Sequence, residues 1–299
     1  MEDNAFVKLR YSFAKKLDEL MLGSNLIEDL DRVYMPLANM INVGITSPGQ
    51  TIIIGVNGAQ GAGKTSFGHL MKLVLEEGFN LKTLNLSIDD LYLSHEAREV
   101  LAERVHPLLK TRGVPGTHDV QLGLDLLDKL CNASGSQKTL IPRFDKATDN
   151  PFSDSECDSF IGRPDVILFD GWFMGAEKQP DSDLYEPINK LEEEEDPDGV
   201  WRRYVNDMLG KSYKQLFDKL DLLVMLQVPS FEKVYEWRTL QEHKLRLSSS
   251  GKKNLRVMTD EEVKRFIMHY ERITRWELTD LPAKCDMLFK VNDNHRIYI

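Results

Sequence analysis

The chain has 299 residues, of which 41% are hydrophobic, and a formal net charge of −10. Its length suffices for one large α/β domain or two smaller ones, and no apolar run approaches the length of a membrane span. The acidic balance disfavours nucleic-acid binding as the main role. Three scattered cysteines argue against a disulfide framework. The N-terminus lacks the apolar segment of a signal peptide, so we expect a cytoplasmic protein with no membrane partner.

Helical patterning opens the chain. Apolar residues such as Phe13 and Leu17 recur at helical spacing and predict two or three helices over residues 5–45. We expect residues 1–48 to form a helical extension that packs against a larger domain of residues 49–299.

A glycine-rich loop follows the first predicted strand. The β-branched run from Ile52 to Val56 is typical of a buried strand, residues 58–65 match the pattern G-x-x-x-x-G-K-[ST], and residues 66–75 have helical spacing. Glycines let several backbone amides point into one concavity, and a helix N-terminus adds partial positive charge. The motif therefore predicts a phosphate cradle, with Lys64 on the β and γ phosphates and Thr65 on Mg²⁺. The predicted nucleotide-binding residues are Gly58, Ala59, Gln60, Gly61, Ala62, Gly63, Lys64, Thr65 and Ser66.

Strands and helices alternate through the rest of the chain. We expect strands at 82–88, 165–169, 222–228 and 286–291, and helices at 95–110, 120–131, 201–220, 231–247 and 260–278. Residues 139–144 are expected to be extended, residues 147–160 and 178–200 to form surface loops, and the acidic run 192–196 to be solvated. The alternation predicts an α/β fold of the P-loop NTPase type, a mainly parallel sheet with helices on both faces.

Aspartates follow two of these strands, at the edge where ligands collect in open α/β sheets. Asp170 is a candidate for holding Mg²⁺ through water, and the alternative is a turn cap beside Gly171. Asp89 and Asp90 end the strand after the glycine loop. One of them can accept the proton of a substrate hydroxyl, both can serve the metal site, or the pair can cap a helix. The residues alone leave these interpretations open.

Cationic side chains lie in the loops downstream. Together Arg112, His118, Arg143 and Lys146 can form a pocket for an anionic acceptor, because Arg pairs bidentately with carboxylates. Each alone is more often a solvated charge, and His118 can instead hydrogen-bond the loop backbone.

A charged helix precedes a Ser- and Gly-containing break. Arg238, Lys244 and Arg246 on this helix predict a helical lid, at about 232–256, that closes cations over the γ-phosphate. The alternative is an ordinary charged helix face. The tryptophans that we interpret as packing residues are Trp172, Trp237 and Trp276.

Six further strings occur in order between about residues 50 and 275. They are SIDDLY (87–92), RGVPGTHD (112–119), PRFDKA (142–147), FDGWFMG (169–175), WRTLQEHKLR (237–246) and MTDEEVKRFIMHY (258–270). Together they resemble the D-glycerate 3-kinase-like P-loop kinases, which belong with phosphoribulokinase, uridine kinase and bacterial pantothenate kinase. The resemblance implies that ATP with Mg²⁺ phosphorylates a hydroxyl of a small molecule, D-glycerate in the namesake enzymes.

The resemblance also implies roles for single residues. Asp89 becomes the expected general base, with a further link to the metal, and Asp170 and Thr65 become the expected metal residues. Lys64 and the lid residue Arg238 become the expected catalytic cations. The expected acceptor-binding residues are Asp90, Tyr92, Arg112, His118, Asp119, Arg143 and Lys146.

Two positions depart from the family pattern. Asp170 stands where relatives usually carry Glu, which changes the metal geometry, and Asp149-Asn150 stands where relatives often carry Arg. If that Arg helps to hold the acceptor, the acceptor of this chain can differ from D-glycerate.

Other functions therefore stay open beside a D-glycerate kinase acting as a monomer or homodimer. They are a nucleoside- or pantothenate-type kinase, an ATP-binding regulatory protein of the same fold, and a GTPase. The guanine-reading motif of a GTPase is matched only loosely, by Asn189-Lys190-Leu191-Glu192.

Overall fold

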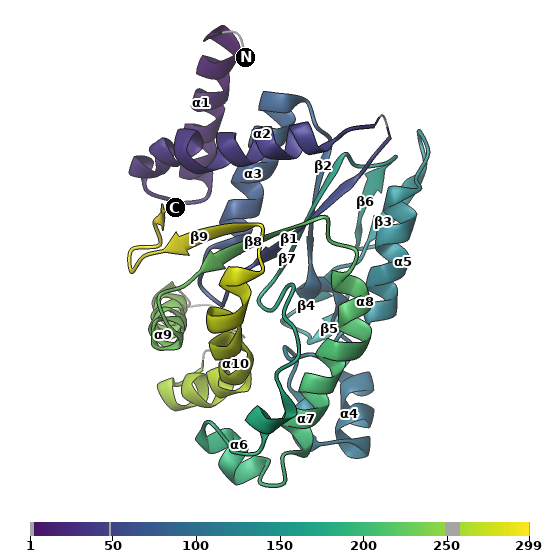
Figure 1. Cartoon of the computed structure of the whole chain (residues 1–299), viewed down its shortest axis with the longest axis vertical. Helices are drawn as coiled ribbons and strands as arrows, with labels where there is room; N and C mark the ends of the chain where they lie inside the picture. The colour runs from purple at the N-terminus through teal and green to yellow at the C-terminus, as the bar shows by residue number, and fades with distance from the viewer. Residues whose placement is uncertain (1–2, 48, 249–257, 299) are drawn as a thin grey trace.

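A computed structural model describes residues 3–47, 49–248 and 258–298 of the chain (Figure 1). Its centre is a six-stranded sheet in the order β10-β9-β8-β1-β7-β2. The pairings from β9 through to β2 are parallel, and β10 pairs antiparallel with β9. The predicted mainly parallel sheet is therefore confirmed. The strands are β1 (Ile52–Asn57), β2 (Thr83–Ser87), β7 (Val166–Gly171), β8 (Leu222–Gln227), β9 (Met287–Val291) and β10 (Ile297–Tyr298).

The central strands are almost continuously apolar because both faces of the sheet are covered. Every residue of β1 is buried, and so is β7 apart from Asp170. In the register of the sheet Val56 pairs with Asp170, and Ser87 pairs with the same residue from the other side. Three strands thus end level with one another, and the residues that follow them meet at one edge.

Helices cover the sheet on both sides, as the right-handed crossover rule requires for this strand order. Figure 1 shows α3 with α1 and α2 on one side, and α5 with α8 on the other. The long helices α9 and α10 lie together below β8 and β9. The helices are α1 (Asp3–Glu19), α2 (Met35–Gly44), α3 (Lys64–Phe79), α4 (His95–Arg104), α5 (Val120–Cys131), α6 (Lys190–Glu195), α7 (Val200–Met208), α8 (Lys214–Phe217), α9 (Phe231–Ser248) and α10 (Asp260–Asp280).

The N-terminal helices share the core of the sheet domain. Leu9, Phe13 and Leu17 of α1 are buried, and an edge-to-face contact of 5.2 Å joins the ring of Phe13 to that of Tyr34. Tyr34 in turn lies 5.4 Å from Phe67 of α3. The helical extension thus packs against α3, while its treatment as a separate unit with a boundary at residue 48 stays a prediction.

Two regions expected to be loops contain regular structure. In the predicted loop 147–160, β6 (Asp158–Ile161) pairs antiparallel with β3 (Lys138–Ile141), and β5 (Asn150–Pro151) pairs with β4 (Phe144–Asp145). Both partner strands overlap residues 139–144, which were expected to be extended. Further on, α6 occupies part of the region 178–200 that was expected to be a loop.

The prediction that the acidic run 192–196 is solvated is wrong at two of its residues. Glu192 and Asp196 are buried. Glu192 accepts from Arg272 of α10 at 2.5 Å, and Asp196 pairs with Arg202 of α7 at 3.1 Å. Because both arginines are themselves buried, each needs a carboxylate beside it.

Residues 232–248 of the predicted lid belong to α9, and α10 follows the lid. Thr259 and Glu262 form a capping box at the start of α10. Residues 249–256 of the predicted lid, and the side chains of Lys244 and Arg246, lie outside what the structure describes. Among the described helices, none is both long and apolar enough to cross a lipid bilayer.

Candidate active site

The glycine loop joins the end of β1 to the start of α3. Gly61 and Gly63 have φ angles of 83° and 90°, a left-handed conformation that glycine adopts without a steric penalty. A Cβ at Gly58 would lie only 3.1 Å from the Cβ of Leu226 on β8. These three positions therefore need glycine for conformation or for space, and the loop presents its amides at the N-terminus of α3 as an anion cradle requires.

Lys64 is the first residue of α3 and is aimed at the cradle. Its Nζ donates to the carbonyl oxygens of Gly58 at 2.6 Å and Ala59 at 3.3 Å. Burial lowers the pKa of Lys64, and the negative charges of Asp170 and Asp89 oppose this shift. The ammonium thus spans the loop at the point where the motif predicts the β and γ phosphates.

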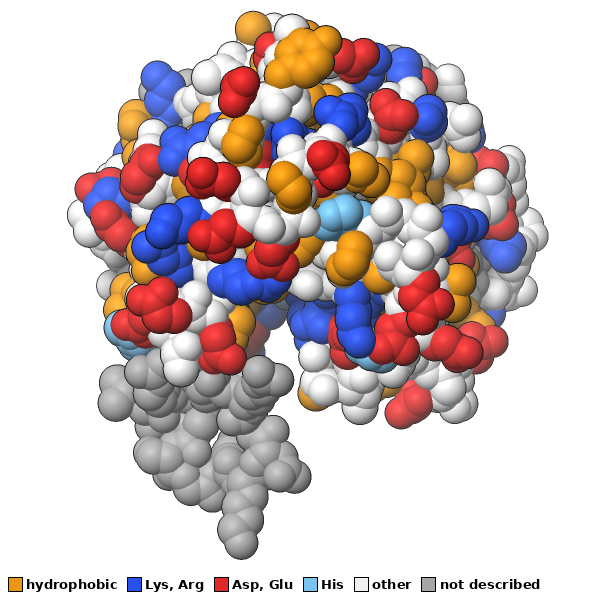
Figure 2. Space-filling model, turned by 90° about the horizontal axis from the view of Figure 1, so that it is seen from below, with side chains coloured by type: hydrophobic (Ala, Val, Ile, Leu, Met, Phe, Trp, Pro, Cys, Tyr) orange, Lys and Arg blue, Asp and Glu red, His pale blue; other side chains and the backbone are white. Residues whose placement is uncertain are grey.

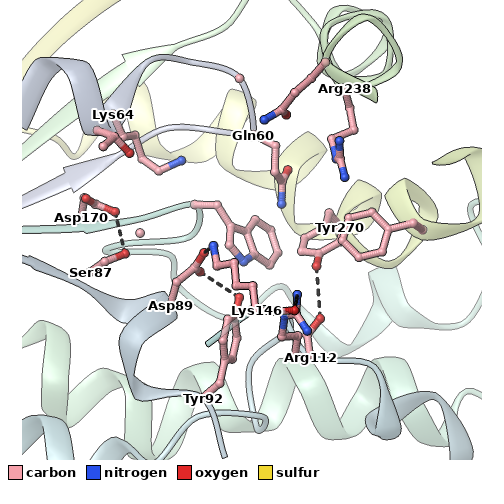
Figure 3. A pocket seen from close by; sticks show the side chains of 16 residues that line it. Gln60, Lys64, Ser87, Asp89, Tyr92, Arg112, Lys146, Asp170, Arg238 and Tyr270 are labelled. Carbon is pink, nitrogen blue, oxygen red and sulfur yellow. Dashed lines mark hydrogen bonds and ion pairs between the residues drawn. The ribbon is translucent and has the colours of Figure 1, made fainter. Parts of the chain in front are cut away.

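Asp170 lies at the end of β7, beside the cradle. Its Oδ1 accepts from the Ser87 hydroxyl of β2 at 3.0 Å (Figure 3). Burial raises the pKa of Asp170, against the effects of Lys64 and Ser87. Mg²⁺ usually takes one or two carboxylates together with phosphates and waters. The half-buried carboxylate of Asp170 lines the same cavity as Thr65, so the two residues fit that requirement.

Asp89 follows β2 and has both carboxylate oxygens engaged. Oδ1 accepts from the Tyr92 hydroxyl at 2.8 Å, and Oδ2 from Lys146 Nζ at 2.6 Å (Figure 3). Burial acts to raise the pKa of Asp89, but the charge and hydrogen bond of Lys146, with the bond from Tyr92, lower it below its ordinary value. Asp89 is therefore ionised, and one of its oxygens holds a cation.

These groups line one polar cavity of about 420 Å³. Arg238 reaches it from α9 and Tyr270 from α10, while Arg112 lies below Tyr270, on the side away from Lys64 (Figure 3). The residues lining the cavity are Gln60, Gly61, Lys64, Thr65, Ser87, Asp89, Tyr92, Arg112, Lys146, Asp170, Gly171, Trp172, Arg238, Gln241, Phe266 and Tyr270. The topology thus gathers the predicted phosphate, metal, base and lid residues in one place.

A second hollow, of about 360 Å³, adjoins the first. The two share Gly61, Lys64, Thr65 and Gln241. The far wall of the second hollow includes Trp237 and His295, whose rings lie 4.2 Å apart. Trp237 is thus a packing residue, as expected, and also a wall residue. A cradle between two hollows suits phosphoryl transfer, which needs a donor on one side and an acceptor on the other.

Four predicted acceptor-binding residues lie outside this cavity wall, and the structure gives them supporting contacts instead. Asp90 accepts from Arg143 Nη1 at 2.8 Å and from the Phe144 amide at 3.2 Å. This pair fixes β4, the strand directly before Lys146. Asp119 caps α5 by accepting from the Leu122 amide at 2.9 Å.

His118 is the fourth of these residues. Its ring is buried, stacks on Tyr92 at 4.4 Å and lies 2.7 Å, through Nδ1, from the Tyr213 hydroxyl. Burial lowers the pKa of His118 to about 3, so the ring is neutral. We therefore correct its expected role to that of a support behind Tyr92.

Several lining residues were not predicted from the sequence. Phe266 and Tyr270 belong to the wall, and their spacing of four on an amphipathic helix was the available signal. Ser87 entered the sequence analysis only as the first residue of the string SIDDLY, two positions before Asp89. Asn189 and Lys190, the loose GTPase match, do not line either hollow at the glycine loop within the described residues.

Comparisons with known proteins agree with this geometry. No family model matches the chain. It is 30% identical to an uncharacterised kinase of Schizosaccharomyces pombe, over 74% of this chain and 79% of that protein. It is 29% identical to a probable ATP-dependent kinase of Saccharomyces cerevisiae, over 91% of this chain and 93% of that protein. The solved structure of a D-glycerate 3-kinase from Cryptococcus neoformans superposes with a TM-score of 0.70 at 25% identity, covering 89% of this chain and 97% of that one.

The parallel sheet, the glycine loop and the acids at the strand ends define a protein of the P-loop kinase class. Within that class, the chain belongs to the D-glycerate 3-kinase-like family, as its six strings indicated.

Proposed function

We propose that this chain transfers the γ-phosphoryl group of ATP to a hydroxyl of a small hydroxy acid, with D-glycerate as the first candidate. The observation that carries the proposal is the shared cavity. Lys64 at the phosphate cradle and Asp89 at the end of β2 line the same wall, and Arg112 lies at the end of the cavity farther from the cradle.

Each of these residues has a separate role in an in-line transfer of the phosphoryl group. The loop amides and Lys64 hold the phosphates, and Asp89 removes the proton of the acceptor hydroxyl. The hydroxyl oxygen then attacks the γ-phosphorus, the bond to the β–γ bridging oxygen breaks, and ADP leaves. Arg238 stabilises the negative charge of the transferring group. Mg²⁺ held by Thr65 and Asp170 would add positive charge at the phosphates, and whether Asp89 also binds it stays a prediction.

The charges of the cavity support an anionic acceptor. Arg112 and Lys146 both line the cavity, and Arg112 Nη2 lies 3.5 Å from the backbone carbonyl oxygen of Lys146. Two cationic side chains in one cavity wall are suitable partners for an acceptor carboxylate. The name of the Cryptococcus relative, D-glycerate 3-kinase, supports the same acceptor class.

The test is an acceptor screen with the purified full chain, ATP and Mg²⁺. ADP formation is measured with D-glycerate first, then with pantothenate, uridine and glycerol. We expect phosphorylation of D-glycerate or of another small hydroxy acid. ATP binding with no acceptor-dependent product across the panel would favour the regulatory alternative, and preference for uridine or pantothenate would replace the acceptor class.

A further inference from the structure

The cations of the cavity are all paired, and one pair differs from the rest. Four cationic side chains line the cavity: Lys64, Arg112, Lys146 and Arg238. Lys64 binds loop carbonyls, and the two arginines bind Asp149 and Glu242, carboxylates that do not line the cavity.

Lys146 alone among these four pairs with a carboxylate of the cavity itself. Its partner Asp89 is the proposed base. The ammonium lies 2.6 Å from Oδ2, while the Tyr92 hydroxyl occupies Oδ1. An oxygen that already accepts from an ammonium is poorly placed to take a proton from an alcohol. The base is therefore occupied in this structure.

The pair can be opened at little cost. The Lys146 side chain is 59% exposed and that of Asp89 is 31% exposed. Because the ammonium end of the pair is open to water, solvent screens the pair and another anion can compete for the ammonium. Arg112 lines the same cavity as Lys146 and reaches the Lys146 backbone oxygen, so an acceptor carboxylate finds a second cation in the wall that carries Lys146.

The backbone that carries Lys146 is held in place. It follows β4, which Asp90 holds through the side chain of Arg143 and the amide of Phe144. The backbone of residue 146 is thus anchored while its long side chain is free to exchange partners.

We propose that Lys146 is a latch on the base Asp89: its ammonium occupies Asp89 Oδ2 until the anionic group of the acceptor displaces it. This inference rests on the proposed kinase function. A carboxylate or phosphate on the acceptor draws Lys146 away, and Asp89 Oδ2 then takes the proton of the acceptor hydroxyl. The lone pair left on the acceptor oxygen attacks the γ-phosphorus, the bond to the β–γ bridging oxygen breaks, and ADP leaves. Water or a neutral alcohol binds without releasing the base. The latch thereby suppresses ATP hydrolysis when no acceptor is present, and it selects for charged acceptors.

The test is ATP hydrolysis by the full chain without any acceptor. Lys146→Met removes the ammonium and leaves Asp89 free to activate water. We expect hydrolysis to rise roughly tenfold, a small part of the 10²- to 10⁴-fold effect of a positioned general base. The matched control is Lys211→Met, which removes a similarly exposed lysine paired with Asp207 at 2.9 Å and lying outside the cavity. We expect no rise there.

A double variant separates the latch from a general disturbance of the site. In Asp89→Asn/Lys146→Met the rise should disappear, because the base itself is gone. Hydrolysis by Lys146→Met no faster than by Lys211→Met, or a rise that persists in the double variant, would overturn the latch. Neither result depends on which acceptor is used.

The acceptor arm adds a second readout. With Lys146→Met, kcat/KM should fall for D-glycerate and rise for glycerol, which carries no charge. A simple anion-binding lysine would lower the first value and leave the second unchanged, and that result would also overturn the latch. If the wild-type chain phosphorylates neither compound, the proposed acceptor class fails, and the hydrolysis comparison still decides the latch.

Discussion

At the residue scale, Asp89 is distinguished from its neighbour Asp90 by where the side chain points. Asp89 lines the cavity and Asp90 does not. We expect Asp89→Asn to lower kcat by about 10²- to 10⁴-fold, the usual worth of a general base. The affinity for ATP should stay nearly unchanged. Turnover is measured as ADP release, and ATP affinity by calorimetric titration.

Asp90→Asn is the matched comparison, since it makes the same chemical change one residue along. It weakens the support of β4 through Arg143, so we expect a kcat loss of less than about tenfold, below the lower end of the general-base effect. Equal losses in the two variants would show that the carboxylates act through the fold, and unchanged turnover in Asp89→Asn would remove it from the mechanism.

His118 carries a prediction about pH. Its pKa is lowered from 6.5 to about 3 by burial. Below pH 6.5 the unfolded chain binds a proton that the folded chain does not, so stability is present above that pH and falls as the pH falls toward 3. The slope for one such group reaches about 1.4 kcal/mol per pH unit.

His118→Phe keeps an aromatic ring beside Tyr92 but cannot titrate. Although the variant loses the contact with Tyr213 and some stability, its free energy of unfolding should depend less steeply on pH between about 6 and 4.5. Urea denaturation across that range measures the slope. Parallel curves for the variant and the wild type would mean that His118 is not neutral in the folded protein.

At the scale of elements, local sequence patterns predicted what local forces determine. The apolar runs of β1, β7 and β8 were recognised because strands covered on both faces of a sheet are almost continuously apolar. The pairing of β3 with β6 joins residues about twenty positions apart, and no local pattern specifies it. Glu192 was misjudged for the same reason, because its partner Arg272 lies 80 residues away.

In the candidate active site, too, the residues marked by a local pattern could be predicted and those placed by long-range packing could not. Lys64, Asp89 and Asp170 could be placed because a motif and two strand ends fix them. Tyr270 could not, because its position depends on how α10 docks, where its hydroxyl reaches the backbone oxygen of Arg112 at 3.2 Å. His118 was expected to bind the acceptor and is instead buried outside the cavity wall, because the sequence does not show which member of a polar loop turns inward.

The contact between the glycine loop and α9 gives a prediction for these two elements. A Cβ on Gly61 would lie 3.2 Å from Trp237 Cβ, whereas a Cβ on Gly63 would meet nothing within 4 Å. Both glycines have positive φ, so alanine costs backbone strain at either position. Only Gly61→Ala also crowds α9, and overpacking costs about 1–3 kcal/mol.

We therefore expect Gly61→Ala to lower the free energy of unfolding more than Gly63→Ala does, by that amount. Urea denaturation of the two variants side by side measures the difference. Equal losses would indicate that Trp237 moves aside at no cost and that α9 is not fixed by the loop.

At the scale of the whole molecule, the lower face mixes charges of both signs. Figure 2 shows Lys and Arg side chains interspersed with Asp and Glu, and no extended region of one sign forms among the described residues on that face. The positive charge relevant to an anionic substrate is instead gathered inside the cavity, at Lys64, Arg112, Lys146 and Arg238. A net charge of −10 is thus compatible with phosphate chemistry, because the local field is set by the cavity wall.

The N-terminal helices and the sheet share one hydrophobic core. An aromatic chain runs from Phe13 through Tyr34 and Phe67 to Phe289 of β9, with the last two ring centroids 6.1 Å apart. Phe13 is fully buried, while Tyr11 on the same helix is 74% exposed. Phe13→Ala should cost about 3–5 kcal/mol, and Tyr11→Ala should stay within about 0.5 kcal/mol.

Because the aromatic chain crosses from the extension into the sheet, we expect Phe13→Ala to move a single unfolding transition of the whole chain to lower temperature. The kcat at low temperature should be unchanged, since Phe13 lies outside the cavity wall. Calorimetry of the variant and the wild type measures the number of transitions. Two transitions, of which Phe13→Ala shifts only the first, would instead establish residues 1–48 as an independently folding unit attached to the kinase domain.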